Sequence, residues 1–148
     1  MIGKEHLDQQ IGKPLKDGKF ECMQMDDQSP EDINVTYLKF CDQWLRIVTT
    51  DGQTKIVLKE PKEVVTTFEG TTCRYFQSTL GVFPDFMLQN ENRLLRFTEL
   101  VSTKTGQSFG IKLYFENGRN IIIRNHDYPI DKTEYISGNF QLDGLAEK

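Results

Sequence analysis

Side chains suited to metal binding or acid–base catalysis are scarce in this chain. The two histidines, His6 and His126, stand near opposite ends of the sequence. The three cysteines, Cys22, Cys41 and Cys73, are widely spaced and form no Cys-x-x-Cys pair. Structural zinc sites and disulfide frameworks both depend on closely or regularly spaced ligands. The sequence therefore predicts no metal site and no metal or redox cofactor.

Nucleophilic catalysis by a thiol needs a neighbouring base and a setting that stabilises the thiolate. No cysteine follows a glycine-rich elbow or begins a convincing helix. Asp127 follows His126 directly, and consecutive residues of an extended segment point apart, so the two form no catalytic dyad. The glycines are scattered at turns, without a phosphate-binding or dinucleotide-binding pattern. We expect that the protein is not an enzyme and that its cysteines are free thiols that serve packing.

Length and composition favour one folded domain, residues 1–148, with a core built from strands. The 148 residues include ten Phe, five Tyr and one Trp, besides many Val, Ile and Thr. The 22 acidic and 18 basic side chains give a net charge of −4, which opposes general nucleic-acid binding. No stretch approaches the roughly 18 apolar residues of a membrane span, and residues 1–11 lack the apolar part of a secretion signal. We expect a cytoplasmic protein that binds neither nucleic acid nor membrane.

The first eleven residues predict a short helix, because Leu7 and Ile11 have helical spacing and Gly12 and Pro14 stop it. Strands are expected from residue 20, and 35–40, 44–50 and 53–59 form a run of hairpins. A two-residue turn at Asp51-Gly52 sets Ile47 opposite Ile56, whereas a slip by one residue sets Ile47 beside a lysine. The sequence therefore predicts a type I′ turn at this position.

A second hairpin is expected at Asn117-Gly118, with a different loop. A two-residue loop sets Ile111 opposite Arg124 and leaves apolar and polar side chains mixed on both faces of the hairpin. A three-residue loop of residues 116–118 pairs Ile111 with Ile123 and sorts the apolar side chains onto one face. Gly118 then takes the left-handed conformation of a type I turn with a glycine bulge.

The other segments give weaker signals. Residues 62–69 fit a helix or a strand, and four consecutive β-branched residues favour the strand. Residues 26–34 predict a turn, with Ser29 as a helix cap and at most one helical turn after Pro30. Residues 133–142 add one edge strand, and the last residues are expected to fray. The fold class is mainly β: an antiparallel sheet, or a partly closed barrel or sandwich, with a short N-terminal helix.

Two groups of residues suit contact with a partner protein. The densest charge cluster, Asp26, Asp27, Glu31 and Asp32, is either a solvated turn or a docking site for a basic protein. The aromatics Tyr75, Phe76, Phe83 and Phe86 cap the core, or else form a rim for an apolar ligand or an anchor for a protein. The predicted partner-binding residues, which include the late loop as well, are Asp26, Asp27, Glu31, Asp32, Trp44, Phe83, His126, Asp127 and Tyr128.

The stretch IKLYFENGRNIIIRNHDYP resembles a late hairpin of small bacterial immunity proteins of polymorphic toxin systems. Those proteins often carry apolar alternation, an Asn-Gly turn and a polar or aromatic tail. The resemblance covers about residues 109–129 and identifies no particular family. It implies a non-catalytic cytosolic antidote that binds and blocks one toxin domain, often a basic nuclease. No functional residue is carried over, because the shared positions are structural.

Three functions are therefore compared. The first is a non-catalytic module that binds another protein, in the form of a cytosolic immunity protein that blocks a toxin domain. The alternative is an intracellular small-ligand carrier, since a β-barrel of eight or more strands that encloses one ligand needs about this length. A small hydrolase or isomerase comes third, because the chain offers few pairs of nucleophile and base.

Overall fold

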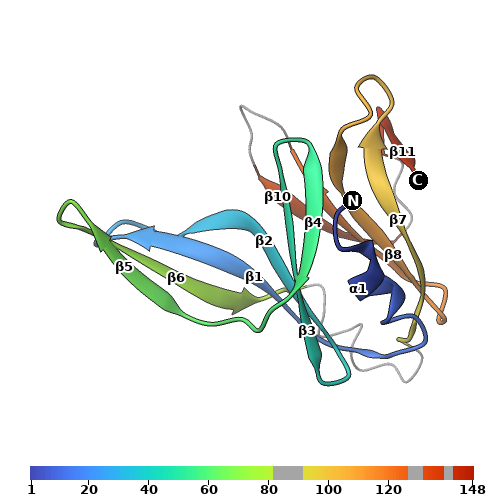
Figure 1. Cartoon of the computed structure of the whole chain (residues 1–148), viewed down its shortest axis with the longest axis horizontal. Coiled ribbons are helices and arrows are strands. Elements are labelled where there is room, and N and C mark those ends of the chain that lie inside the picture. The colour runs from blue at the N-terminus through green and yellow to red at the C-terminus, as the bar shows by residue number, and fades with distance from the viewer. Residues whose placement is uncertain (82–91, 127–131, 139–141) are drawn as a thin grey trace.

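The computed structural model describes residues 1–81, 92–126, 132–138 and 142–148 and contains one short helix and two antiparallel sheets (Figure 1). The fold class is therefore mainly β, as the sequence predicts. The elements are α1 (Lys4–Asp8), β1 (Leu15–Met25), β2 (Glu31–Phe40), β3 (Gln43–Thr50), β4 (Gln53–Leu58), β5 (Val64–Phe68), β6 (Thr71–Thr79), β7 (Leu94–Ser102), β8 (Ser108–Phe115), β9 (Asn120–Asn125), β10 (Thr133–Ser137) and β11 (Leu145–Glu147).

The first sheet has six strands in the order β4-β3-β2-β1-β6-β5, and the second has five in the order β10-β9-β8-β7-β11. All paired strands within the two sheets are antiparallel. The segment 62–69, for which helix and strand were both open, contains β5 and is a strand. The sequence also predicts an edge strand within 133–142, and β10 is that edge.

Both predicted hairpin registers are confirmed. In the first hairpin, Ile47 pairs with Ile56, and Asp51 and Gly52 have φ of 51° and 69°, the positive values that a type I′ turn requires. In the second hairpin, Ile111 pairs with Ile123. Gly118 has φ of 77° and its N–H donates to the Phe115 carbonyl at 3.0 Å, which is the three-residue loop with a left-handed glycine.

The two sheets pack through one apolar cluster. From the first sheet it takes Leu38, Phe40, Leu45, Ile47 and Ile56, each at most 2% exposed. The opposing side chains of the second sheet are Leu94, Ile111, Leu113, Phe115, Ile121 and Ile123. Alternate residues of each strand point to the same face, so the core face of the first sheet fixes which side chains lie on its outer face.

Four strands of the first sheet extend beyond this core and form an arm (Figure 1). Contacts to the second sheet occur at its base, where the ring of Tyr135 of β10 lies tilted against Phe20, with centroids 6.3 Å apart, and its hydroxyl shares a hydrogen bond of 2.8 Å with Thr36. Beyond that point, β1 and β2 continue to the turn at residues 26–28, beside the β5–β6 hairpin. We call residues 21–34 and 62–78 the arm.

Two local predictions are wrong. The segment after Pro30 is not helical, because β2 begins at Glu31, which pairs with Met23 across the sheet; pairing with β1 overrides the weak capping signal. The last residues do not fray within the described range, because β11 pairs with β7. Glu147 holds it there, accepting a hydrogen bond from Lys112 Nζ at 2.8 Å.

The glycine bulge gives a stability prediction. No atom lies within 4 Å of a Cβ built on Gly118, so a substitution there strains only the backbone. Gly118→Val should lower the free energy of unfolding by about 1–3 kcal/mol, measured by chemical denaturation. Gly118→Asn is the control, because asparagine tolerates a positive φ. Equal stability of the two variants would contradict the loop assignment.

Candidate functional site

Apolar side chains gather on the outer face of the arm. Met23, Tyr75 and Val64 lie side by side on β1, β6 and β5. Met25 occupies the next row, and Phe68 the row beyond it. Phe68 is 73% exposed and Val64 is 43% exposed, while the methionines and Tyr75 are half-buried. We call these five residues the outer patch; aromatic and methionine side chains of this kind are common in protein-binding surfaces.

The predicted acidic turn lies at the tip of the arm, next to the outer patch. Asp26 is mainly structural: its N–H donates to the Thr72 carbonyl at 2.8 Å, and its Oδ1 accepts from the Thr72 N–H at 2.9 Å. These two bonds tie the β1–β2 turn to the start of β6. Asp27 and Glu31 are exposed beside it, and Glu69 in the β5–β6 turn adds another carboxylate.

The negative charge of the protein is concentrated in the arm. Its two segments contain seven acidic and two basic side chains, a net charge of −5. Since the whole chain has 22 acidic and 18 basic side chains, the remainder has 15 and 16, a net charge of +1. The arm is therefore an apolar surface within a negative field, and the rest of the molecule is nearly neutral.

A buried polar network supports the base of the arm on the same outer face. The Tyr37 hydroxyl donates to Glu21 Oε2 at 2.7 Å, and Gln77 Nε2 donates to the same oxygen at 3.3 Å. Arg46 Nη2 lies 3.8 Å from Glu21 Oε1. Burial, together with the hydrogen bond to Glu21, raises the pKa of Tyr37 to about 12, while Arg46 acts in the opposite direction. The network joins β1, β2, β3 and β6.

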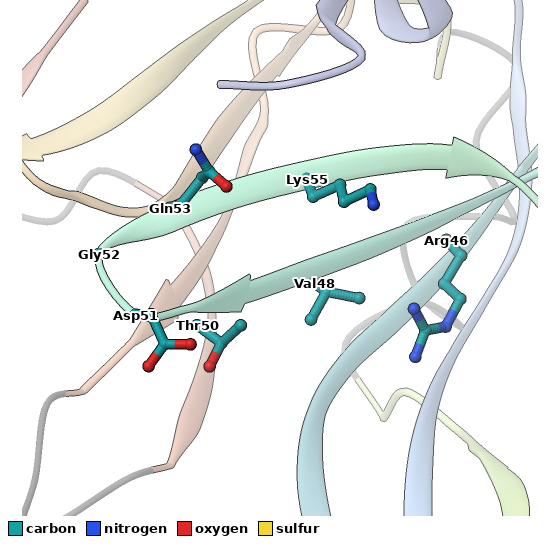
Figure 2. A pocket seen from close by; sticks show the side chains of 7 residues that line it. All are labelled: Arg46, Val48, Thr50, Asp51, Gly52, Gln53 and Lys55. Atoms are coloured by element: carbon teal, nitrogen blue, oxygen red, sulfur yellow. The ribbon is translucent and has the colours of Figure 1, made fainter.

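Next to this network, the β3–β4 hairpin forms an open depression of about 360 Å³ (Figure 2). It holds two cationic side chains, of which Arg46 also belongs to the buried network, and one carboxylate at the turn. The depression is shallow and lies on the sheet face away from the core. Its lining residues are Arg46, Val48, Thr50, Asp51, Gly52, Gln53 and Lys55.

Trp44 lies on the same face but away from the arm. The ammonium groups of Lys19 and Lys39 lie 5.5 and 5.7 Å from the centre of its ring, within the range of cation–π attraction. The half-buried indole is thus placed among basic side chains near the start of β3, whereas the depression extends to the turn at the other end of that strand. The structure does not bring it together with the acidic turn.

His126 lies in the second sheet, where β9 ends. Its Nε2 is 2.9 Å from Glu134 Oε2 of β10, and its backbone N–H donates to the Lys132 carbonyl at 2.9 Å. These contacts join the ends of β9 and β10. A surface depression of about 240 Å³ beside the histidine is lined by Ser102, Phe109, Arg124, Asn125, His126 and Leu145.

The predicted site residues thus fall into separate places. Asp26, Asp27 and Glu31 meet at the arm tip, whereas Asp32 lies on the inner side of the arm, where its Oδ1 is 3.5 Å from Cys22 Sγ. Phe83, Asp127 and Tyr128, like the aromatic Phe86, lie outside the described residues. Sequence reasoning missed the outer patch, although its signal was present: β1 carries apolar residues on both faces, as in Cys22 and Met23.

Cys22, Cys41 and Cys73 are free thiols, and burial raises the pKa of Cys22, which disfavours its thiolate. Within the described part of the chain, no three His, Cys, Asp or Glu side chains gather as a potential metal site. No described helix is long and apolar enough to cross a membrane.

Comparisons with protein-family models, with curated proteins and with solved structures find no match to this chain.

The buried network gives a testable prediction. Tyr37→Phe should lower the free energy of unfolding by about 1–3 kcal/mol, because the buried Glu21 carboxylate loses its closest donor. The matched control is Tyr75→Phe, since the described residues supply no hydrogen bond to the Tyr75 hydroxyl. Denaturation at neutral pH compares the two variants, and equal losses would contradict the role assigned to Tyr37.

The raised pKa of Tyr37 leads us to expect that the stability of the protein depends on pH in the alkaline range. The pKa of Tyr37 is about 12 in the folded protein and roughly 10 in the unfolded chain. Folding therefore favours the protonated phenol, and this stabilisation is complete below about pH 10 and is lost as the pH rises towards 12. Stability should fall less steeply over this range in Tyr37→Phe than in the unaltered protein.

Proposed function

We propose that this protein is a non-catalytic module that binds a basic partner protein through the outer patch and the acidic tip of its arm. The observation that carries the proposal is the coincidence of exposed apolar side chains with the concentrated negative charge. Of the seven large apolar side chains that are exposed among the described residues, three belong to β5: Val64, Val65 and Phe68.

The two features supply different parts of binding. A positive partner is drawn to the arm by its net charge of −5, and such long-range attraction raises the rate of association. Apolar contacts then hold the complex, and aromatic side chains usually contribute most to slow dissociation. Phe68 is the best placed of these, because it is the most exposed large apolar side chain of the described residues.

The more specific form of this proposal is a cytoplasmic antidote that blocks a basic toxin domain. Its support is the resemblance of residues 109–129 to late hairpins of immunity proteins, together with the charge of the arm. The hairpin itself is a core element, since Ile111, Leu113, Ile121 and Ile123 are buried. In this proposal the late hairpin builds the scaffold and the arm makes the contact.

Affinity capture from the source cell tests the patch. The unaltered protein should retain a protein partner, and Phe68→Asp should lose it, because a carboxylate would replace the most exposed apolar side chain of the contact. Leu95→Asp is the matched control, since Leu95 is an exposed apolar residue of β7, outside the arm. Equal loss in both variants, or retention in both, would contradict the assignment of the patch.

Charge reversal tests the steering. Asp27→Lys together with Glu31→Lys changes the charge of the arm from −5 to −1, and should slow association with the captured partner about tenfold or more at low salt. Stopped-flow or surface binding measures the rate against salt concentration, because screening removes the effect. The control, Glu116→Lys with Asp143→Lys, makes the same net change outside the arm and should leave the rate nearly unaltered. Equal slowing in the control would sink the idea.

A further inference from the structure

The four strands at the sheet edges differ in how far their backbones are covered. On β4, Ile2 forms a bridge: its N–H donates to the Thr54 carbonyl and its carbonyl accepts from the Ile56 N–H, both at 2.9 Å. Edge strand β11 is only three residues long. Edge strand β10 lies against the first sheet, where Thr133 Oγ1 donates to Asn34 Oδ1 at 2.8 Å. Natural sheets protect their edges by such means, because the unpaired N–H and C=O groups of an open edge strand can pair with a strand of another chain.

Edge strand β5 has none of this protection. All five of its residues are exposed, and four of them are β-branched. It contains no proline or lysine, the residues that commonly block an edge. Within the described residues, no backbone hydrogen bond reaches its open side. This is the edge of the arm, next to Val64 and Phe68 of the outer patch.

Hairpin geometry shows which backbone groups of β5 are available. The two-residue turn of Glu69 and Gly70, with φ of 48° and 84°, is closed by the pair Phe68 and Thr71. In such a hairpin the closing pair exchanges hydrogen bonds, and every second residue repeats this. Val64, Thr66 and Phe68 therefore bond to β6, and the N–H and C=O groups of Val65 and Thr67 point to the open side.

We propose that β5 accepts an extended strand of the basic partner, which pairs with the backbone of Val65 and Thr67 and continues the first sheet. This inference rests on the proposed function and specifies how the partner is held. The added strand is positively charged, to suit the arm, and places apolar side chains next to Val64 and Phe68 on the outer face. Strand addition of this kind combines backbone affinity with side-chain selection.

Charge also disfavours a second copy of this chain at the same edge. One symmetric antiparallel register that uses the open groups sets Val65 opposite Thr67 of the other copy. The same register sets Glu63 opposite Glu69, and like charges directly opposite each other destabilise a sheet. Two arms of net charge −5 would also repel each other.

Model peptides test the edge without the native partner. The probe is a Lys-Val repeat of about eight residues, long enough for an ordinary strand. It should slow hydrogen exchange at the amides of Val65 and Thr67 by about tenfold or more, as observed by NMR. A Glu-Val repeat should have no effect because of its charge, and a Lys-Pro repeat should have little, because proline cannot form the ladder.

Val65→Pro supplies the matched variant. Its N–H points away from β6, so the proline should leave the β5–β6 hairpin intact while it removes a donor from the open edge. Val65→Thr keeps the donor and should bind the Lys-Val repeat as the unaltered protein does. Protection of the β6 and β9 amides reports whether each variant is folded; if Val65→Pro is not, the comparison of the three peptides on the unaltered protein decides.

Three results would overturn the inference: equal protection by the Lys-Val and Lys-Pro repeats, protection by the Glu-Val repeat, or unchanged binding to folded Val65→Pro. Sedimentation that shows a dimer abolished by Val65→Pro would overturn it too, since a second copy would then occupy the edge. Because these probes do not involve the native partner, their failure is distinguishable from failure of the proposed function, which is read from capture by the Phe68→Asp and Leu95→Asp variants.

Discussion

The packing of the two sheets against each other determines where the arm lies and which of its surfaces stay uncovered. Apolar burial contributes roughly 25 cal/mol per Å², and here it is concentrated where β2, β3 and β4 face β8 and β9 through Leu38, Ile47 and Ile111. Only part of the first sheet takes part in that core. One end of β1 and one end of β2 pack in the core, and β6 pairs with β1. The core therefore positions the arm, which these strands form further along, without covering it.

An arm of this kind needs support where it leaves the core, and the buried carboxylate of Glu21 supplies it. A buried charge is tolerated only when several donors compensate it, and Tyr37 and Gln77 donate to it while Arg46 lies nearby. These side chains belong to four adjacent strands, so their relative positions are fixed together. The network thus links these four strands where the arm leaves the core, while the outer patch beyond it is at least partly exposed.

Much of the fold was predictable, because local chemistry decides it. The Asp51-Gly52 and Asn117-Gly118 turns set the registers, and a shift by one residue would have placed Ile47 or Ile111 beside a charged side chain. The failures have a common physical cause. Strand pairing overrode the capping signal before Glu31, and a long-range contact from Lys112 to Glu147 held a terminus that looked free. Of the proposed site, the sequence indicated the acidic turn but not the outer patch beside it, because the patch depends on register between strands far apart in sequence.

Charge and edge protection together explain why an open strand is tolerated on the arm. An unprotected edge ordinarily promotes self-association, and β5 has the β-branched composition that favours it. β5 contains no proline or lysine that would block pairing at its edge. Glu63 and Glu69 flank the strand, however, and the acidic turn lies at the same tip of the arm. Symmetric pairing of two copies therefore meets like charges, whereas a basic strand meets opposite ones. In the proposed mode of binding, the negative field of the arm serves two purposes: it opposes pairing of the edge with a second copy, and it selects a basic strand.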